Sequence, residues 1–187
     1  MPSRRSKALG VIRLAAVYLF VALLVWFSRP TPALFALGAI VVAAGEAVRI
    51  WAAGHLVKSL ELIDSGPYAY TQNPLYLGRL LILTGFCIMA RNHYFLNWIA
   101  LALGYLVFFG YYIPRKLRVE GGRLQKMHGD SWARYHAAVP ILFPSLTRHT
   151  GKTTPWSLGR AVKNQEYLVL SGVVLVLAFF AWKTWRP

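Results

Sequence analysis

Long apolar runs alternate with short polar segments along most of the chain. A helix needs about 20 predominantly apolar residues to cross the ~30 Å hydrocarbon core of a bilayer, and the longer runs meet that length. The expected spans are residues 8–27, 32–53, 75–90, 95–113 and 167–182. This pattern predicts an all-α integral membrane helical bundle of about five transmembrane helices, organised as a single membrane domain over residues 1–187.

Two of these runs differ from a simple crossing helix. The apolar part of residues 8–27 is long for a signal peptide, and residues 28–32 offer no small-residue cleavage pattern, so we predict a retained helix. Residues 75–90 are short for a full crossing, which predicts a helix that is tilted, surrounded by thinned bilayer, or buried among its neighbours. Only residues 91–94 separate this run from the next, so the two form a helical hairpin.

The second run contains two charged residues. Pro32 suits the first turn of the helix, and Glu46 and Arg49 lie three residues apart, hence on one helical face. Unpaired charges are costly within a membrane. We therefore favour an internal ion pair near the headgroups over a direct role in a site.

Composition agrees with the apolar pattern. The chain is 57% hydrophobic and 14% charged, and it carries 21 Lys and Arg residues against 6 Asp and Glu, a formal charge of +15. A charge of this size suits nucleic acid or anionic headgroups, but many of the basic residues flank apolar runs, so we predict contact with membrane lipids and no nucleic acid. The single cysteine, Cys87, excludes an internal disulfide or a cysteine metal cluster, and no metal site is predicted.

The basic residues also predict the orientation, because positive residues are retained on the cytoplasmic side. Ten of them lie in residues 114–165, which form a polar segment with a short helical part. We therefore predict that residues 114–165, the loop at 54–74 and the N-terminus share the cytoplasmic face. A bacterial inner membrane and an endoplasmic reticulum fit these signals equally well.

The polar loop that leads into the third run, residues 65–79, carries the residues most directly suited to a function. Asn73 suits a helix N-cap with Pro74 at the first helical position, and the amides of a helix N-terminus attract carboxylates. Tyr70 and Tyr76 supply ring faces and hydroxyls, and Gly78 allows close approach of a ligand or of another helix. An interfacial aromatic belt ahead of a well-capped helix explains these residues equally well.

Two blocks of the sequence resemble the isoprenylcysteine carboxyl methyltransferase and phospholipid methyltransferase group of membrane enzymes. The first block is Gly66-Pro67-Tyr68 followed by Asn73-Pro74-Leu75-Tyr76-Leu77-Gly78. The second block, after the hairpin, consists of Glu120, Leu124, Gly129, Trp132, Tyr135 and Val139-Pro140. The resemblance covers roughly residues 45–144, and its strength comes from the order of the blocks and the hairpin between them.

The resemblance implies that the chain binds S-adenosylmethionine and methylates a lipophilic substrate that arrives from the bilayer. The implied cofactor-binding residues are Tyr70, Asn73, Pro74, Tyr76, Gly78, Glu120, Tyr135 and Pro140. Read from their chemistry, helix amides after Asn73 and the hydroxyl of Tyr76 suit the carboxylate of the cofactor, Glu120 suits its ammonium, and aromatic faces suit its sulfonium. A salt bridge of Glu120 with an arginine of its own short helix is an equally good interpretation.

Methyl transfer from a sulfonium is an in-line displacement, in which positioning and desolvation carry most of the catalysis. A carboxylate acceptor would need a nearby cation, and we assign Arg79 and Arg134 to this catalytic role. An amine or thiol acceptor would have to lose a proton, for which His128 and His136 are the possible bases. Headgroup contact is the alternative role of each arginine.

The chain departs from the family pattern at functional positions. Gln72 and Asn73 stand where the family has Arg-His, and Gly121 stands where it has a second glutamate. These replacements keep open a membrane scaffold that has the fold without the activity. Residues 129–135 and the following Val139-Pro140 also look like the C-terminal signature of NADPH-dependent membrane sterol reductases, which is the second enzymatic alternative.

Overall fold

The computed structural model describes residues 19, 22–57, 61–92, 95–151 and 154–186. Within these ranges the chain is helical without β-strands, which confirms the predicted all-α membrane bundle. In the part of the chain that the structure describes, three helices are long and apolar enough to cross a membrane: Pro32–His55, Leu96–His128 and Glu166–Trp185. Most of the expected first span, residues 8–27, lies outside the described residues. Residues 22–26 of this span are described and are helical.

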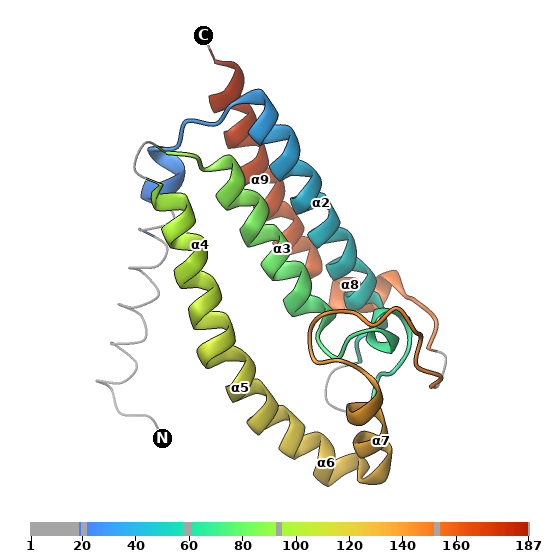
Figure 1. Ribbon diagram of the computed structural model, residues 1–187. Helices are drawn as coiled ribbons and strands as arrows, with labels where there is room; N and C mark the ends of the chain where they lie inside the picture. The colour runs from blue at the N-terminus through green and yellow to red at the C-terminus, as the bar shows by residue number, and fades with distance from the viewer. Residues whose placement is uncertain (1–18, 20–21, 58–60, 93–94, 152–153, 187) are drawn as a thin grey trace, which may run out of the picture.

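Helices α2 (Pro32–His55), α3 (Pro74–Met89) and α9 (Glu166–Trp185) form the centre of the molecule (Figure 1). They bury Val42, Met89 and Phe180 completely against one another. Burial of apolar side chains on α3 explains how a helix of 16 residues sits in the bundle, because part of its surface faces α2 instead of lipid.

Glycines set the close approach of α2 and α3. A Cβ added to Gly45 would come within 2.8 Å of the Gly78 carbonyl oxygen, and one added to Gly38 would come within 2.6 Å of the Gly85 carbonyl oxygen. The two glycines of each helix are seven residues apart, so both pairs lie on the same contact face. Small residues at these points let the two backbones touch, as is common in membrane helix pairs.

The fourth apolar run continues further than the sequence suggested. We predicted that the helix would end near Ile113 and that a polar segment would follow, but one continuous helix runs from Leu96 to His128 through α4 (Leu96–Val107), α5 (Ile113–Lys116) and α6 (Gly122–His128) (Figure 1). Two π-helical turns, η2 (Phe108–Tyr112) and η3 (Leu117–Gly121), interrupt it. The η2 turn directly precedes the segment that contains Pro114, and the helix continues past this proline.

Arg49 joins three helices within the bundle. Its Nε lies 3.8 Å from Glu46 on α2, as the sequence predicted, but only 2.7 Å from the carboxylate of Glu166 at the start of α9. Its guanidinium also donates to the Leu75 carbonyl in the first turn of α3. All three charged side chains are buried. Glu166 is the partner that sequence spacing could not reveal, because it lies 117 residues from Arg49.

Two connecting segments pack together beyond the ends of α2 and α3. The first contains η1 (Gly66–Ala69), and the second follows α7 (Asp130–Ala138). Backbone hydrogen bonds join them from Gln72 to Pro140 and from Ser145 to Tyr70. The short helix α8 (Leu158–Lys163) then returns the chain to α9, and the amide of Asn164 donates to the Ala53 and Leu56 carbonyls at the end of α2.

Candidate cofactor and substrate pocket

A cavity of about 420 Å³ lies where the start of α3, the far part of the long helix, α7 and the loop before α3 meet. Its polar and aromatic lining consists of Glu61, Tyr68, Gln72, Asn73, Tyr76, Arg79, Lys116, Glu120, Arg123, His128, Trp132 and Tyr135. Its other lining residues are mainly leucines, with Ile63, Val57, Pro74 and Gly121. The cavity has the size and the mixed lining of a small-molecule site.

The start of α3 forms one wall. Asn73 occupies the N-cap position and Pro74 is the first helical residue, as predicted, but the Asn73 side chain does not cap the helix. Its amide instead donates to the Ile141 carbonyl over 2.7 Å, which ties α3 to the segment after α7. The Oδ1 atom of Asn73 is buried without a hydrogen-bond partner among the described residues. This oxygen is therefore free to accept a hydrogen bond from a ligand. The role expected for the first α3 amides is not supported, because Pro74 has no N–H and the Tyr76 and Leu77 amides both donate to the Asn73 carbonyl oxygen.

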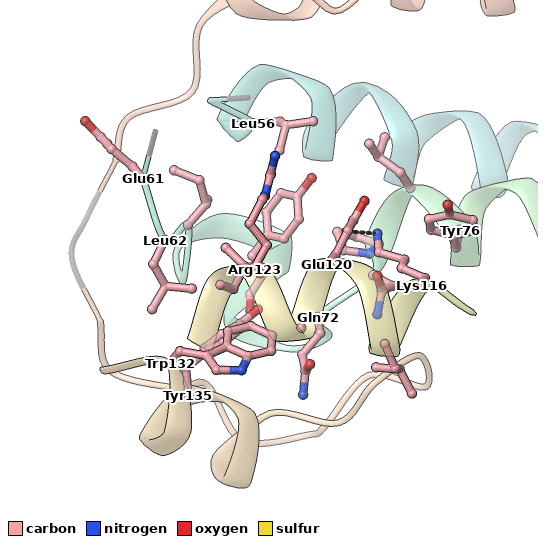
Figure 2. Close-up of a pocket in the computed structure, with 18 of the residues that line it drawn as sticks. Leu56, Glu61, Leu62, Gln72, Tyr76, Lys116, Glu120, Arg123, Trp132 and Tyr135 are labelled. Atoms are coloured by element: carbon pink, nitrogen blue, oxygen red, sulfur yellow. Dashed lines mark hydrogen bonds and ion pairs between the residues drawn. The ribbon is translucent and has the colours of Figure 1, made fainter. Parts of the chain in front are cut away.

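Lys116 and Glu120 form the charged centre of the pocket. The Lys116 ammonium lies 3.0 Å from the Glu120 carboxylate one helical turn away, and Figure 2 marks this pair with a dashed line. The same ammonium lies 4.3 Å from the centre of the Tyr76 ring, and the Arg79 guanidinium carbon lies 5.1 Å from it. Tyr76 thus already attracts cations with its ring face. The salt-bridge interpretation of Glu120 holds, with Lys116 as the partner instead of an arginine.

Trp132 and Tyr135 on α7 close the opposite side (Figure 2). The Tyr135 hydroxyl donates to the Tyr68 carbonyl over 2.9 Å, so it joins the two sequence blocks directly. Burial raises the pKa of both Tyr68 and Tyr135 well above the ordinary value of a phenol. Both hydroxyls therefore stay protonated at physiological pH, and Tyr135 remains a hydrogen-bond donor.

The structure brings six of the expected site residues to this pocket: Asn73, Pro74, Tyr76, Arg79, Glu120 and Tyr135. The other four do not line it. Arg134 is exposed on α7, Pro140 contributes only its carbonyl to the bond with Gln72, and Tyr70 packs its ring 6.3 Å from that of Trp51.

Gly78 is the fourth residue outside the pocket. A side chain there would meet Arg49 and the Gly45 carbonyl oxygen of α2, so the glycine serves the contact between helices and not the approach of a ligand. Of the two roles that the sequence left open for this residue, the structure assigns the packing one.

Sequence reasoning missed several lining residues. Lys116 could have been predicted, because it lies four residues before Glu120 and hence on the same helical face. His128, whose Nε2 is buried without a partner among the described residues, was considered only as a base. Leu56 and Leu62 could not have been predicted, since only the folded loop brings them to the cavity.

Comparison with known proteins gives one significant relative. The chain is 29% identical over 157 residues to the cobalt-zinc-cadmium resistance protein CzcN of Cupriavidus metallidurans. The aligned region covers 80% of this chain and 69% of that protein. No protein-family model matches the chain. No solved structure matches it either.

Proposed function

We propose that this integral membrane protein is an S-adenosylmethionine-dependent methyltransferase that acts on a lipophilic acceptor. The observation that carries the proposal is the meeting of the two sequence blocks around one cavity, with Glu120, Tyr76 and the start of α3 on its walls. The resemblance of these blocks to the membrane methyltransferases supplies the chemistry, which is transfer of the sulfonium methyl group of the cofactor.

The pocket residues suit each part of this cofactor. Glu120 accepts a hydrogen bond from an ammonium, and Arg123, another residue of the lining, suits a carboxylate. The Trp132 ring, which also lines the pocket, suits a sulfonium, whereas the Tyr76 ring already has two side-chain cations over it. Asn73 Oδ1 and His128 Nε2, both buried without partners among the described residues, suit the donors of an adenine or a ribose.

The chain's own residues contribute positioning and desolvation. The hydrogen bonds from Asn73 to Ile141 and from Tyr135 to Tyr68 fix two walls of the pocket relative to each other. Apolar residues such as Leu56, Leu62 and Leu124 keep water from the reacting atoms. We assign the pocket to the cytoplasmic face, where the cofactor is made, on the strength of the basic residues in 114–165.

Equilibrium binding to the detergent-solubilised protein tests the proposal. We expect S-adenosylhomocysteine to bind and NADPH to bind at least tenfold more weakly. Selective binding of NADPH would favour the sterol-reductase alternative. Binding of neither by a monodisperse protein would reject both enzymes and favour the scaffold. The name of the CzcN relative describes a resistance to metals and specifies no reaction, so cofactor binding is the more direct test.

A further inference from the structure

A second, smaller groove adjoins the pocket on the side of the membrane helices. It has a volume of about 200 Å³ and lies between α3 and the long helix. Its lining, apart from two residues shared with the pocket, is Leu80, Leu83, Gly104, Phe108 and Tyr112. Hydrogen bonding between the hydroxyls of Thr84 and Tyr105, 2.6 Å apart, holds the two helices together beside it.

Tyr76 and Arg79 line both the groove and the pocket. Arg79 lies five residues into α3, or about 7.5 Å along its axis, which is near the level of the lipid headgroups if α3 begins at the interface. The side chain is exposed, and no carboxylate of the described residues lies within salt-bridge distance of it. Its guanidinium carbon lies 5.1 Å from the centre of the Tyr76 ring.

An arginine near the end of a membrane helix that has no carboxylate partner is suited to bind an anion. Lys116, the other cation on the Tyr76 ring, already has Glu120 as a partner. An acyl or prenyl chain fits the leucine and phenylalanine walls of the groove. The lining therefore combines a place for a hydrocarbon chain with a cation at its polar end.

We propose that the groove binds an anionic membrane lipid, whose chain lies between α3 and the long helix and whose acidic head group contacts Arg79. The head group then faces the pocket at Tyr76. This site does not require methyltransferase activity, because its residues and its ligand can be examined without the cofactor.

Photo-crosslinking in lipid nanodiscs tests the site. Phosphatidylglycerol with a diazirine on its acyl chain is incorporated into phosphatidylcholine discs, and adducts are located by mass spectrometry. We expect adducts at Leu80, Leu83 or Phe108, at least fivefold above those formed by phosphatidylcholine with the same label. Soluble glycerol phosphate at millimolar concentration should not compete, since it lacks a chain.

Arg79→Gln should reduce the phosphatidylglycerol adducts about fivefold, and Arg79→Lys should retain most of them. The matched control is Arg115→Gln, since Arg115 is also a cation over a tyrosine ring, that of Tyr111, but lines neither cavity. Leu83→Trp should fill the groove and remove the adducts without removing Arg79. Equal labelling by the two lipids, equal effects of the two glutamine variants, or competition by glycerol phosphate would each overturn the proposal.

Discussion

Glu120 and Lys116 illustrate how a residue's role depends on its local partner. The Glu120 side chain is about half exposed, at 50%, and its carboxylate is shared with Lys116. A cofactor ammonium must therefore compete with a lysine that is already in place. This competition limits how much affinity the acid can contribute, because an exposed pair is worth little.

Replacing Glu120 with Gln should weaken S-adenosylhomocysteine binding by about tenfold, the lower end of what a charge-assisted hydrogen bond contributes. Titration calorimetry on the solubilised protein measures this change. Lys126→Ala, on an exposed position of α6 that does not line the pocket, is the control and should bind as the wild type does. Unchanged binding by Glu120→Gln would place the ammonium elsewhere.

Some pocket residues can be recognised from their neighbours in the sequence, and others only from contacts that the fold creates. Asn73, Pro74 and Tyr76 were predicted because helix starts have local chemistry, and Glu120 because acids are scarce in this chain. Gly78 was assigned to the pocket although it packs on Gly45, because a glycine's purpose depends on the neighbour that only the fold supplies. Glu166 was missed for the same reason.

At the scale of the elements, the contact between α2 and α3 is the tightest in the bundle described here. Gly78→Ala should lower the melting temperature by roughly 3–10 °C, since a Cβ there lies 2.6 Å from the Gly45 carbonyl oxygen and the helices must separate. Gly172→Ala on α9, where nothing lies within 4 Å of an added Cβ, is the matched control and should be neutral. Equal melting temperatures of the two variants would contradict this account.

The second prediction at this scale concerns the attachment of α9. Glu166→Gln should destabilise the protein by about 3 kcal/mol or more, because the nearest carboxylate described for the buried Arg49 guanidinium is then that of Glu46, at 3.8 Å. The Arg49→Gln and Glu166→Gln double variant should lose less than the sum of the single variants. Thermal unfolding in detergent measures both, and simple additivity would show that the pair is not coupled.

Helix positions were largely predictable from the sequence, because apolar runs follow from the thickness of the bilayer. The observed α2 and α9 agree with the expected ranges to within a few residues. The end of the fourth run was wrong because polarity and Pro114 suggested a stop, whereas backbone geometry at η2 and η3 allowed the helix to continue. Local π turns have no reliable sequence signal.

For the whole molecule, α6 and α7, which line the pocket, lie at the opposite end of the bundle from the C-terminal end of α9 (Figure 1). Lys183 near that end donates to carbonyls of Val25 and Ser28, beside the start of α2. A protein with this arrangement should expose Leu146 and Arg186 on different sides of the membrane. The orientation predicted from the basic residues places Leu146 in the cytoplasm.

Cysteine labelling in sealed vesicles tests this topology. Leu146→Cys and Arg186→Cys, each in a Cys87→Ala background, should react with a membrane-impermeant maleimide from opposite sides, with Leu146→Cys protected in right-side-out vesicles. Labelling of both from one side would show that α9 does not cross the membrane. Labelling of each from the reverse side would keep the fold and reverse the assignment of the pocket to the cytosol.

The π turn at η2 takes up one more residue than an ordinary α-helical turn. Residues after the turn therefore point in the same directions as they would in an α-helix one residue shorter. Deleting Gly110, which has no neighbour within 4 Å of an added Cβ, should convert the wide turn to an ordinary one, with at most a bend at Pro114. Lys116 and Glu120 would keep facing the pocket, and S-adenosylhomocysteine binding should fall less than fivefold. Leu103 lies in the regular α-helix α4, where no extra residue is held. Its deletion should therefore rotate Lys116 and Glu120 by about 100° around the helix axis and abolish binding. The two deletions differ only in where the chain loses a residue, so equal losses would show that η2 does not absorb the difference.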